Sequence, residues 1–248
     1  MLKWMGRVAL VTGASSGIGA AICEDLVKHG MKVVGAARRE ERMQCLAEKL
    51  KNEKGSFLPV KCDVTKDDDV IALFDKIKET FGGVDVCVNN AGIIGTGLNL
   101  LNGTTEEWRQ IIDVNVIALC LCSKLTVKSI KERGLDDGHI INISSMAGHH
   151  VYPFEQFHFY TGSKFAVRAL SEALRQEIQA AKSGIRVSVV SPGLVKTEVL
   201  NNASADPVLS KMYENYNSLK SEDIARTVSQ ILAAPSYMEV HDTIVSPR

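Results

Sequence analysis

The chain has no long uninterrupted run of apolar side chains and no excess of either charge, with 29 basic and 29 acidic residues among 248. A bilayer span needs about 20 apolar residues in a row, so we expect no membrane span. The balanced charge gives no reason to expect nucleic acid as a partner. Residues 1–7 lead straight into an apolar run and show no hydrophobic signal segment or cleavage site, so we expect a cytoplasmic protein.

Cysteine is scarce, and no two cysteines form a C-x-x-C pair. Most of the six fall within apolar patterns, which predicts reduced core residues and no disulfides; they are Cys23, Cys45, Cys62, Cys87, Cys120 and Cys122. Internal repeats and low-complexity segments are also missing. The length suits one α/β domain over residues 1–248, and a long connection at about 192–221 is typical of a substrate loop.

Apolar runs alternate with amphipathic segments along nearly the whole chain. We expect strands at 7–12, 32–37, 57–62, 84–89, 139–143, 186–191 and 240–245, and helices at 17–29, 39–51, 67–81, 105–133, 160–181 and 222–234. Continuously apolar strands are typical of parallel sheets that are covered on both faces. The pattern therefore predicts an α/β fold, a single-domain Rossmann-type doubly wound parallel sheet of about seven strands with helices on both faces.

The first turn between a strand and a helix is rich in glycine, with the sequence Thr12-Gly13-Ala14-Ser15-Ser16-Gly17-Ile18-Gly19. Glycine accepts a positive φ and lets the backbone approach a ligand. The helix N-terminus that follows offers unpaired N–H groups and a partial positive charge, which suit a pyrophosphate. An ordinary glycine-containing turn is the alternative, since the spacing T-G-x-x-x-G-x-G is wider than G-x-G-x-x-G.

The second predicted strand ends in Ala37-Arg38-Arg39. In a dinucleotide fold an acidic residue there binds the ribose 2′-OH of NAD, whereas an arginine accommodates the 2′-phosphate of NADP. The arginines therefore favour NADP over NAD, with a solvated pair as the alternative. Asp63 ends the third strand, where its carboxylate could bind the adenine amino group or serve as a turn residue. Asn89-Asn90-Ala91-Gly92 ends the fourth strand, and its small residues leave room for a cofactor.

Tyr160 and Lys164 are four residues apart at a predicted helix start, so they share a face. A nearby ammonium should lower the pKa of the Tyr160 phenol toward working pH, which would allow proton exchange with a substrate hydroxyl. Ser144 and Ser145 follow the fifth strand, where a hydroxyl could bind the same substrate oxygen. A Y-x-x-x-K pair alone often arises by chance, and its combination with the glycine turn is what gives it weight.

Taken together, these motifs resemble the short-chain dehydrogenase/reductase family over essentially the whole chain. The matching positions are the glycine turn at 12–19, Asp63, Asn89-Asn90-Ala91-Gly92, Asn115, Ser145, Tyr160, Lys164, Pro192-Gly193 and Thr197. The resemblance implies catalytic roles for Tyr160 as general acid/base and Ser145 as substrate orienter. It further implies that Lys164 holds the nicotinamide ribose and that Asn115 holds a water linked to Lys164.

The resemblance also implies which residues bind the cofactor, and no metal is among the expected ligands. Together with the strand-end residues, the expected set is Gly13, Ser15, Ser16, Gly17, Ile18, Gly19, Arg38, Arg39, Asp63, Val64, Asn90, Ala91, Gly92, Tyr160, Lys164, Pro192, Gly193, Val195 and Thr197. Val195 and Thr197 would line the nicotinamide carboxamide. Position 16, often basic in members that use NADP, is serine here, so the preference for NADP depends on the two arginines.

Three further stretches, 4–9, 33–39 and 137–149, are similar to the insect farnesol dehydrogenase group and its vertebrate dehydrogenase/reductase relatives. The interval from Ser145 to Tyr160 is about two residues longer than is usual in the family. His149, His150 and His158 are expected as loop residues near the pocket mouth, not metal ligands. Phe154, Phe157 and Phe159 could be pocket wall or ordinary packing, and Met212, Tyr213 and Tyr216 could close over a substrate or pack on the surface.

The sequence thus predicts an NADP-dependent oxidoreductase that interconverts an apolar alcohol and its aldehyde or ketone. Farnesol or a similar isoprenoid is favoured by the resemblance and by the apolar residues of 194–216. A ketosteroid or general carbonyl reductase is the alternative, and a non-catalytic dinucleotide-binding sensor is a remote one. The long helices at 105–133 and 160–181 carry apolar positions on more than one side, which predicts a homodimer or homotetramer.

Overall fold

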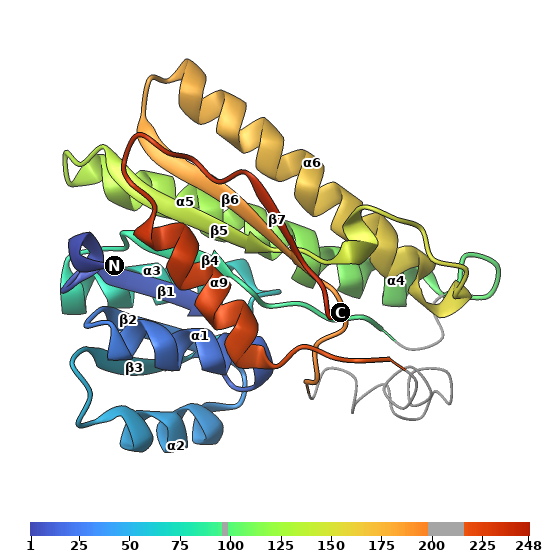
Figure 1. The fold of residues 1–248 in the computed structure, drawn as a ribbon, viewed down its shortest axis with the longest axis horizontal. Coiled ribbons are helices and arrows are strands. Elements are labelled where there is room, and N and C mark those ends of the chain that lie inside the picture. The colour runs from blue at the N-terminus through green and yellow to red at the C-terminus, as the bar shows by residue number, and fades with distance from the viewer. Residues whose placement is uncertain (96–98, 198–215) are drawn as a thin grey trace.

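Seven parallel strands form one sheet in the order β3-β2-β1-β4-β5-β6-β7 (Figure 1). This computed structural model describes residues 1–95, 99–197 and 216–248. The strands are β1 (Val8–Thr12), β2 (Lys32–Ala37), β3 (Ser56–Lys61), β4 (Val86–Asn89), β5 (Asp137–Ile143), β6 (Gly184–Pro192) and β7 (Asp242–Val245). The reversal of order between β1 and β4 is the hallmark of a doubly wound sheet, so the predicted fold class is confirmed.

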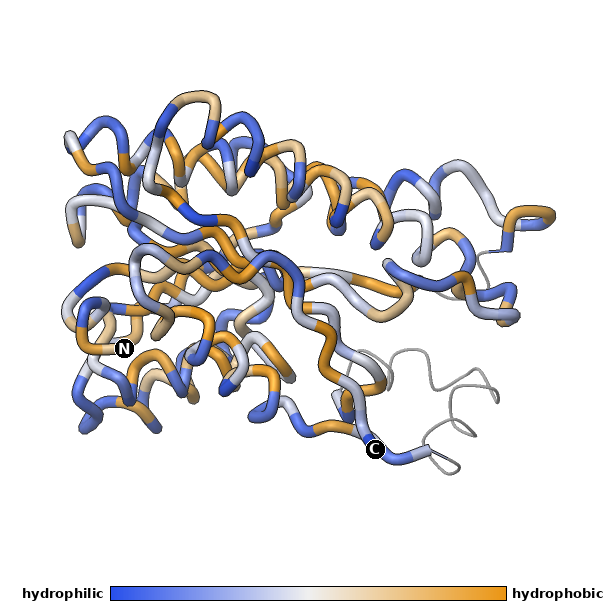
Figure 2. The backbone as a smooth tube through the Cα atoms, turned by 45° about the horizontal axis from the view of Figure 1, so that its top comes forward, coloured by the Kyte–Doolittle hydropathy of each residue, from blue (hydrophilic) through white to orange (hydrophobic). Residues whose placement is uncertain are grey.

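Helices cover both faces of the sheet. The helices are α1 (Gly17–Lys28), α2 (Glu40–Leu50), α3 (Asp67–Phe81), α4 (Thr105–Ile112), α5 (Ala118–Glu132), α6 (His158–Ala180) and α9 (Ser221–Ala233). One apolar core joins α1, α2 and α9 to the sheet, and two others lie under α3, α5 and α6. Hydrophobic residues run along the central strands in Figure 2, whereas the covering helices alternate in hydropathy, as expected when only one helix face is buried.

The carboxyl ends of the strands lie at one edge of the sheet because all pairings are parallel. β1 is buried at every position, and β5 and β6 are buried after their first residue. Such strands have no solvent face, which explains their continuously apolar sequence. Turns and loops that follow these strands therefore meet at a common edge, where ligands bind in such folds.

The helix expected over 105–133 is interrupted. A π-helical turn, η2 (Asp113–Ile117), separates α4 from α5 and contains the buried Asn115. Single π turns insert one residue into a helix and are frequent at functional sites. The stretch Thr105–Glu132 is long and apolar enough to cross a membrane by length and composition, with 44% of its most apolar window buried. Because α5 packs on β4, β5 and α3, this stretch is a core helix of the fold.

All six cysteines are free. Four of them are buried as expected, but Cys45 is exposed on α2 and Cys120 is partly buried. Burial raises the pKa of the Cys23 thiol and of the Cys87 thiol, the latter to about 12, so these thiols stay protonated and unreactive at neutral pH. The prediction of reduced core cysteines is correct for four residues.

Candidate active site

The glycine turn after β1 has the geometry expected from its sequence. Gly13 and Gly17 have φ values of +70° and +55°, which L-residues other than glycine rarely adopt. A Cβ on Gly13 would lie 2.9 Å from Asn90 Nδ2 and 3.0 Å from the Cα of Ala91, and one on Gly19 would collide with the Gly13 carbonyl oxygen. Side chains at these positions would push the turn away from the end of β4.

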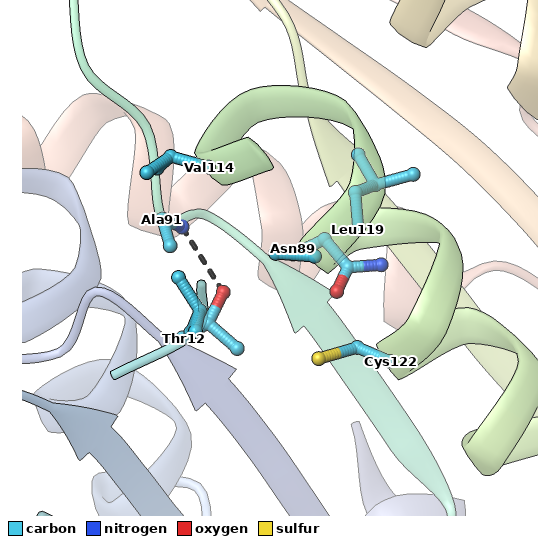
Figure 3. A pocket seen from close by; sticks show the side chains of 8 residues that line it. Thr12, Asn89, Ala91, Val114, Leu119 and Cys122 are labelled. Carbon is cyan, nitrogen blue, oxygen red and sulfur yellow. Dashed lines mark hydrogen bonds between the residues drawn. The ribbon is translucent and has the colours of Figure 1, made fainter. Parts of the chain in front are cut away.

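Thr12 links the ends of β1 and β4. Its Oγ1 accepts hydrogen bonds from the backbone N–H groups of Asn90 at 3.1 Å and Ala91 at 3.0 Å, and Asn90 Nδ2 donates to the Thr12 carbonyl at 2.9 Å. Figure 3 shows Thr12 and Ala91 beside a cavity of about 10 Å³, the size of a single water molecule, which Val64 also lines. These hydrogen bonds hold the ends of β1 and β4 in a fixed position relative to each other.

The start of α1 gathers groups that can bind a phosphate. Its N-cap, Ser16, makes no side-chain capping bond, although helix N-termini present several unpaired N–H groups. The serine hydroxyls instead accept from Arg39: Nη2 donates to Ser16 Oγ at 2.6 Å and to Ser15 Oγ at 3.1 Å. Gly17 faces Thr197, whose Cβ would lie 3.2 Å from an added Cβ. Backbone, hydroxyl and guanidinium groups therefore fit the pyrophosphate and 2′-phosphate of a dinucleotide.

The Arg38 side chain lines a groove of about 520 Å³, which Asp63 and Lys66 also line. Asp63 Oδ1 accepts from the Thr65 N–H at 3.1 Å and from Thr65 Oγ1 at 2.8 Å, which makes Asp63 a turn residue. Although burial raises the pKa of Asp63, these hydrogen bonds and the charges of Arg38 and Lys66 lower it by more, so the net shift is downward. The carboxylate also faces the groove, so both sequence interpretations of Asp63 are compatible with its position.

Ser145, Tyr160 and Lys164 come together at the carboxyl edge. The Ser145 side chain lies close enough to the Tyr160 hydroxyl to lower the pKa of that phenol. Lys164 Nζ lies 5.6 Å from the centre of the Tyr160 ring and donates to the Ile143 carbonyl at 3.0 Å. Gly92 lies beside this group, because a Cβ there would be 3.7 Å from Lys164 Nζ. The turn after β5, the start of α6 and the end of β4 thus meet at one point.

Asn115 is held in place by the π turn and the loop after β4. Its Oδ1 accepts from the Ile93 N–H and its Nδ2 donates to the Ile93 carbonyl, both at 2.9 Å. Nδ2 also lies 3.0 Å from Ser163 Oγ, which donates to the Tyr160 carbonyl at 2.6 Å. Asn115 therefore connects α6 to the loop after β4. In this structure its side chain is bonded to Ile93 and Ser163.

The expected lowering of the Tyr160 pKa by Lys164 is wrong for this structure. Burial raises the pKa of Tyr160 to about 12, although the nearby Ser145 side chain has a lowering effect. Burial also lowers the pKa of Lys164 to about 8. The ammonium hydrogen-bonds the Ile143 carbonyl, and removal from water decides the direction of both pKa shifts.

The end of β6 borders the same site. The Gly193 N–H donates to the Val245 carbonyl at 2.7 Å, and a Cβ on Gly193 would lie 3.1 Å from Met146 Sδ. Pro192 ends β6 and Val195 is buried, where it forms an isolated bridge with Leu219. The expected cofactor residues from this segment thus lie next to the turn that follows Ser145. Of the apolar residues expected to line a substrate pocket in 194–216, those at 199–213 lie outside the described residues.

The histidines and phenylalanines near the site have packing partners. His149 Nε2 lies 3.0 Å from Ser191 Oγ, and His158 Nε2 lies 3.1 Å from the Tyr152 carbonyl. The Phe154 and Phe157 rings meet edge to face, and Phe159 stacks on Trp108 at 5.3 Å. Among the described residues no three potential ligands gather to hold a metal ion.

Sequence reasoning did not single out three of the groups that build this site. Thr12 and Ser163 both lie inside motifs, T-G-x-x-x-G-x-G and Y-x-x-S-K, so their positions could have suggested a role. The Ile143 carbonyl, which receives the Lys164 ammonium, is a backbone group and leaves no signal in the sequence.

Comparison with known proteins agrees with this geometry. Residues 7–208 match the family described as short chain dehydrogenase. A Gallus gallus protein named dehydrogenase/reductase SDR family member 11 is 47% identical over 251 residues, which cover 100% of this chain and 98% of the relative. A farnesol dehydrogenase of Aedes aegypti is 43% identical over 248 residues, which cover 100% of this chain and 98% of the relative.

Solved structures with the same fold contain both cofactors. A closed serine dehydrogenase complexed with NADP+ superposes with a TM-score of 0.86 at 28% identity, over 96% of this chain and 94% of the other. A short chain dehydrogenase/reductase from Burkholderia phymatum in complex with NAD gives 0.87 at 26% identity, over 98% of this chain and 90% of the other. The fold accepts either dinucleotide, so the choice between them depends on local side chains.

Proposed function

Because this chain belongs to the short-chain dehydrogenase family and is an oxidoreductase of alcohol and carbonyl groups, we propose that it is an NADP-dependent enzyme for an apolar alcohol and its aldehyde or ketone. The observation that carries the proposal is the convergence of Ser145, Tyr160 and Lys164 beside Gly92, just after the end of β4. In this proposal residues 1–248 form one cytoplasmic domain, and the segment at about 192–221 is its substrate loop.

Each residue at the edge has a defined task in the proposed reaction. The bound nicotinamide supplies the hydride acceptor for oxidation and the hydride donor for reduction. When an alcohol is oxidised, Tyr160 takes the hydroxyl proton as the carbinol carbon loses its hydride; when a carbonyl is reduced, Tyr160 returns that proton. Ser145 binds the same substrate oxygen and orients it. Lys164, fixed on the Ile143 carbonyl, holds the ribose.

Side chains at the end of β2 support NADP over NAD. Ala37 takes the place where an acidic residue would bind the ribose 2′-OH, and Arg38 and Arg39 follow it. Arg39 already bridges Ser15 and Ser16, so it presents positive charge at the glycine turn. This arrangement offsets the serine at position 16, which is often basic in enzymes that use NADP.

Farnesol or a related isoprenoid alcohol is the proposed substrate. Support comes from the Aedes aegypti relative, which is named a farnesol dehydrogenase. The described part of the segment after β6 also offers the apolar, partly buried Leu194. A ketosteroid or general carbonyl reductase remains the second candidate, since the Gallus gallus relative at higher identity is named only as a dehydrogenase/reductase.

The proposed chemistry is tested by Tyr160→Phe, which keeps the ring but removes the hydroxyl. We expect turnover to fall by at least about 1,000-fold, since general acid/base catalysis contributes up to about 10,000-fold, while NADPH binding changes less than about threefold. The measurement is NADPH oxidation with aldehydes and ketones, paired with a fluorescence titration of NADPH. Binding without any turnover by the wild type would instead favour a dinucleotide sensor.

A further inference from the structure

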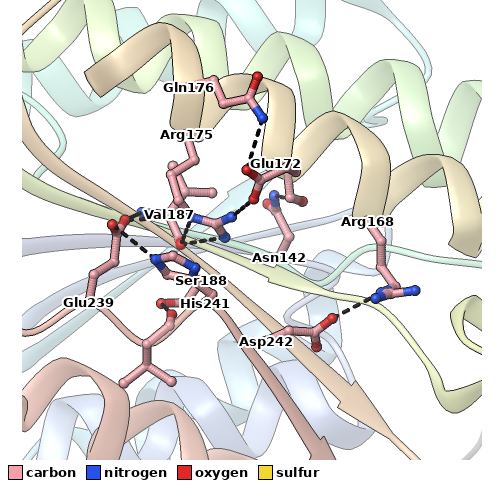
Figure 4. Close-up of polar contacts among 12 residues, drawn as sticks. Asn142, Arg168, Glu172, Arg175, Gln176, Val187, Ser188, Glu239, His241 and Asp242 are labelled. Carbon is pink, nitrogen blue, oxygen red and sulfur yellow. Dashed lines mark hydrogen bonds and ion pairs between the residues drawn. The ribbon is translucent and has the colours of Figure 1, made fainter. Parts of the chain in front are cut away.

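Two arginines connect the helix that carries Tyr160 and Lys164 to the end of the chain. Arg168 and Arg175 lie on α6, one turn and nearly three turns beyond Lys164. Arg168 Nε donates to Asp242 Oδ2 at 2.9 Å, and Arg175 Nε lies 3.7 Å from Glu239 Oε1. Figure 4 shows this row of polar contacts between α6 and the segment that leads into β7. Neither arginine has a task in the reaction proposed above.

Arg168 also grips the turn that follows Ser145. Its Nη1 donates to the Gly148 carbonyl at 2.9 Å. Gly148 is packed so closely on α6 that a Cβ would lie 2.8 Å from the Lys164 carbonyl oxygen and 2.9 Å from Ser144 Oγ. The same turn is tied to α6 by Ser144 Oγ, which donates to the Lys164 carbonyl at 3.3 Å. Arg168 therefore helps to hold the loop that carries Ser145 against α6, the helix that carries Tyr160.

The second oxygen of Asp242 is bonded as well. Ser191 Oγ, fully buried at the end of β6, donates to Asp242 Oδ1 at 3.1 Å, and His149 Nε2 lies 3.0 Å from the same hydroxyl. Because the single Ser191 proton goes to Asp242, His149 must donate from Nε2. Burial together with the charges of Arg168 and His150 lowers the pKa of His149 against the opposing effect of Asp242.

We propose that Arg168 and Asp242 are a positioning pair for the reaction, fixing the Ser145 hydroxyl relative to the Tyr160 hydroxyl through the loop 144–149. This inference depends on the proposed function for its meaning, although the contacts exist without it. Both side chains are partly exposed, at 35% and 28%, so their attraction adds little to stability. Their value lies in geometry, because a misplacement of about 1 Å at a reacting group can cost about 100-fold in rate.

The test compares Arg168→Met, Arg168→Lys and Asp242→Asn with the wild type. We expect kcat about tenfold lower in Arg168→Met, with KM for NADP changed less than about twofold, because the glycine turn is untouched. Arg168→Lys should recover part of the loss, since one ammonium cannot replace both guanidinium bonds. The double variant Arg168→Met/Asp242→Asn should lose no more than Arg168→Met alone. If the double variant instead lost kcat by the product of the two single losses, the residues would act independently and would not be a pair.

Two further measurements separate positioning from general weakening. The Ser145 side chain lowers the pKa of Tyr160. A displaced Ser145 should therefore move the alkaline limb of the kcat profile for carbonyl reduction, which needs the protonated phenol, to higher pH. Glu132→Gln is the matched control, because it removes the Lys78–Glu132 ion pair of 3.1 Å far from the site. An unchanged pH profile in Arg168→Met, or an equal kcat loss in the control, would overturn the proposal.

Amide hydrogen exchange gives a readout that needs no turnover. The N–H groups of Gly148 and His149 donate to the carbonyls of Ser145 and Met146 at 2.9 Å. If Arg168 holds this turn, Arg168→Met should speed exchange in a peptide covering 144–150 about tenfold, with Glu132→Gln unchanged. Unaltered exchange would refute the positioning pair. An inactive wild type would contradict the proposed function alone, because exchange still decides whether Arg168 holds the loop.

Discussion

Burial of the charged Lys164 side chain lowers the free energy of unfolding. Its pKa in the folded chain is about 8, against 10.5 when exposed. Between these values the unfolded chain binds more protons, so the free energy of unfolding rises with pH; below pH 8 the folded protein carries the full cost. That cost is about 3 kcal/mol at 1.36 kcal/mol per pKa unit.

Lys164→Met should therefore stabilise the protein at pH 7 while it abolishes turnover. We expect a net gain of about 1 kcal/mol, because the substitution also leaves the Ile143 carbonyl without its donor. By pH 10 most of the folded wild type has a neutral Lys164, so most of the cost is gone. Lys164→Met should then be less stable than the wild type. Urea unfolding at both values measures this, and Lys76→Met on the exposed face of α3 is the control. If the difference in unfolding free energy between Lys164→Met and the wild type were the same at pH 7 and pH 10, Lys164 would not be a buried charge with a lowered pKa.

Removing the charges of Arg38 and Arg39 should weaken NADP far more than NAD. Each charge-assisted hydrogen bond contributes about 1.5–3 kcal/mol, so Arg38→Gln/Arg39→Gln should raise the Kd for NADP about 100-fold. NAD, which lacks the 2′-phosphate, should change less than about threefold. Arg109→Gln on α4 is the control in these titrations. Equal weakening of both cofactors would mean that the arginines only hold Ser15 and Ser16 in place.

At the scale of single residues, the sequence predicts which side chains share a face better than it predicts how their pKa values shift. The spacing of Tyr160 and Lys164 is enough to place them on one face, because helical periodicity is a local property. The direction of the Tyr160 shift depends instead on how much protein surrounds its hydroxyl, which no local pattern contains. Asp63 shows the same limit, since its bond to Thr65 is local but its place in the groove with Arg38 depends on the sheet.

Among the elements, strands are predicted well and the break in the long helix is not. Continuous apolar runs determine buried parallel strands almost by themselves, so β1, β2, β5 and β6 lie where expected to within two residues. The π turn at Asp113–Ile117 leaves the apolar periodicity on both sides nearly intact. Within this turn Asn115 hydrogen-bonds Ile93, a contact with the loop after β4 that periodicity does not contain.

The segment at about 192–221 should make activity increase with the length of the alcohol. Each buried methylene contributes about 0.8 kcal/mol, so kcat/KM should rise at least about tenfold from dimethylallyl alcohol to geraniol and again to farnesol. The effect should appear mainly as a lower KM. One steroid alcohol assayed beside the series decides between the candidates. A flat series, or a steroid that is used better than farnesol, would exclude the isoprenoid and keep the oxidoreductase chemistry.

For the whole molecule, we predict a homodimer or homotetramer through the helices on one face of the sheet. Ile117 beside α5 is 50% exposed, and Phe165 and Leu170 on α6 are 39% and 38% exposed. Leu170→Glu should lower the mass seen by light scattering at micromolar concentration to that of a monomer. Ile71→Glu, on α3 and 44% exposed, should leave the assembly unchanged. A monomeric wild type would contradict the prediction.

The Arg168–Asp242 contact joins two residues that are made at different times during synthesis. These residues are 74 positions apart, and β7 is the last strand along the chain. The contacts among β1, α1 and β2 are close in sequence and can form early, whereas α1 meets α9 only later. The Ser145 loop gains its final support only after residue 242 has left the ribosome. A nascent chain thus contains its glycine turn long before it can form the Arg168–Asp242 contact that supports the Ser145 loop.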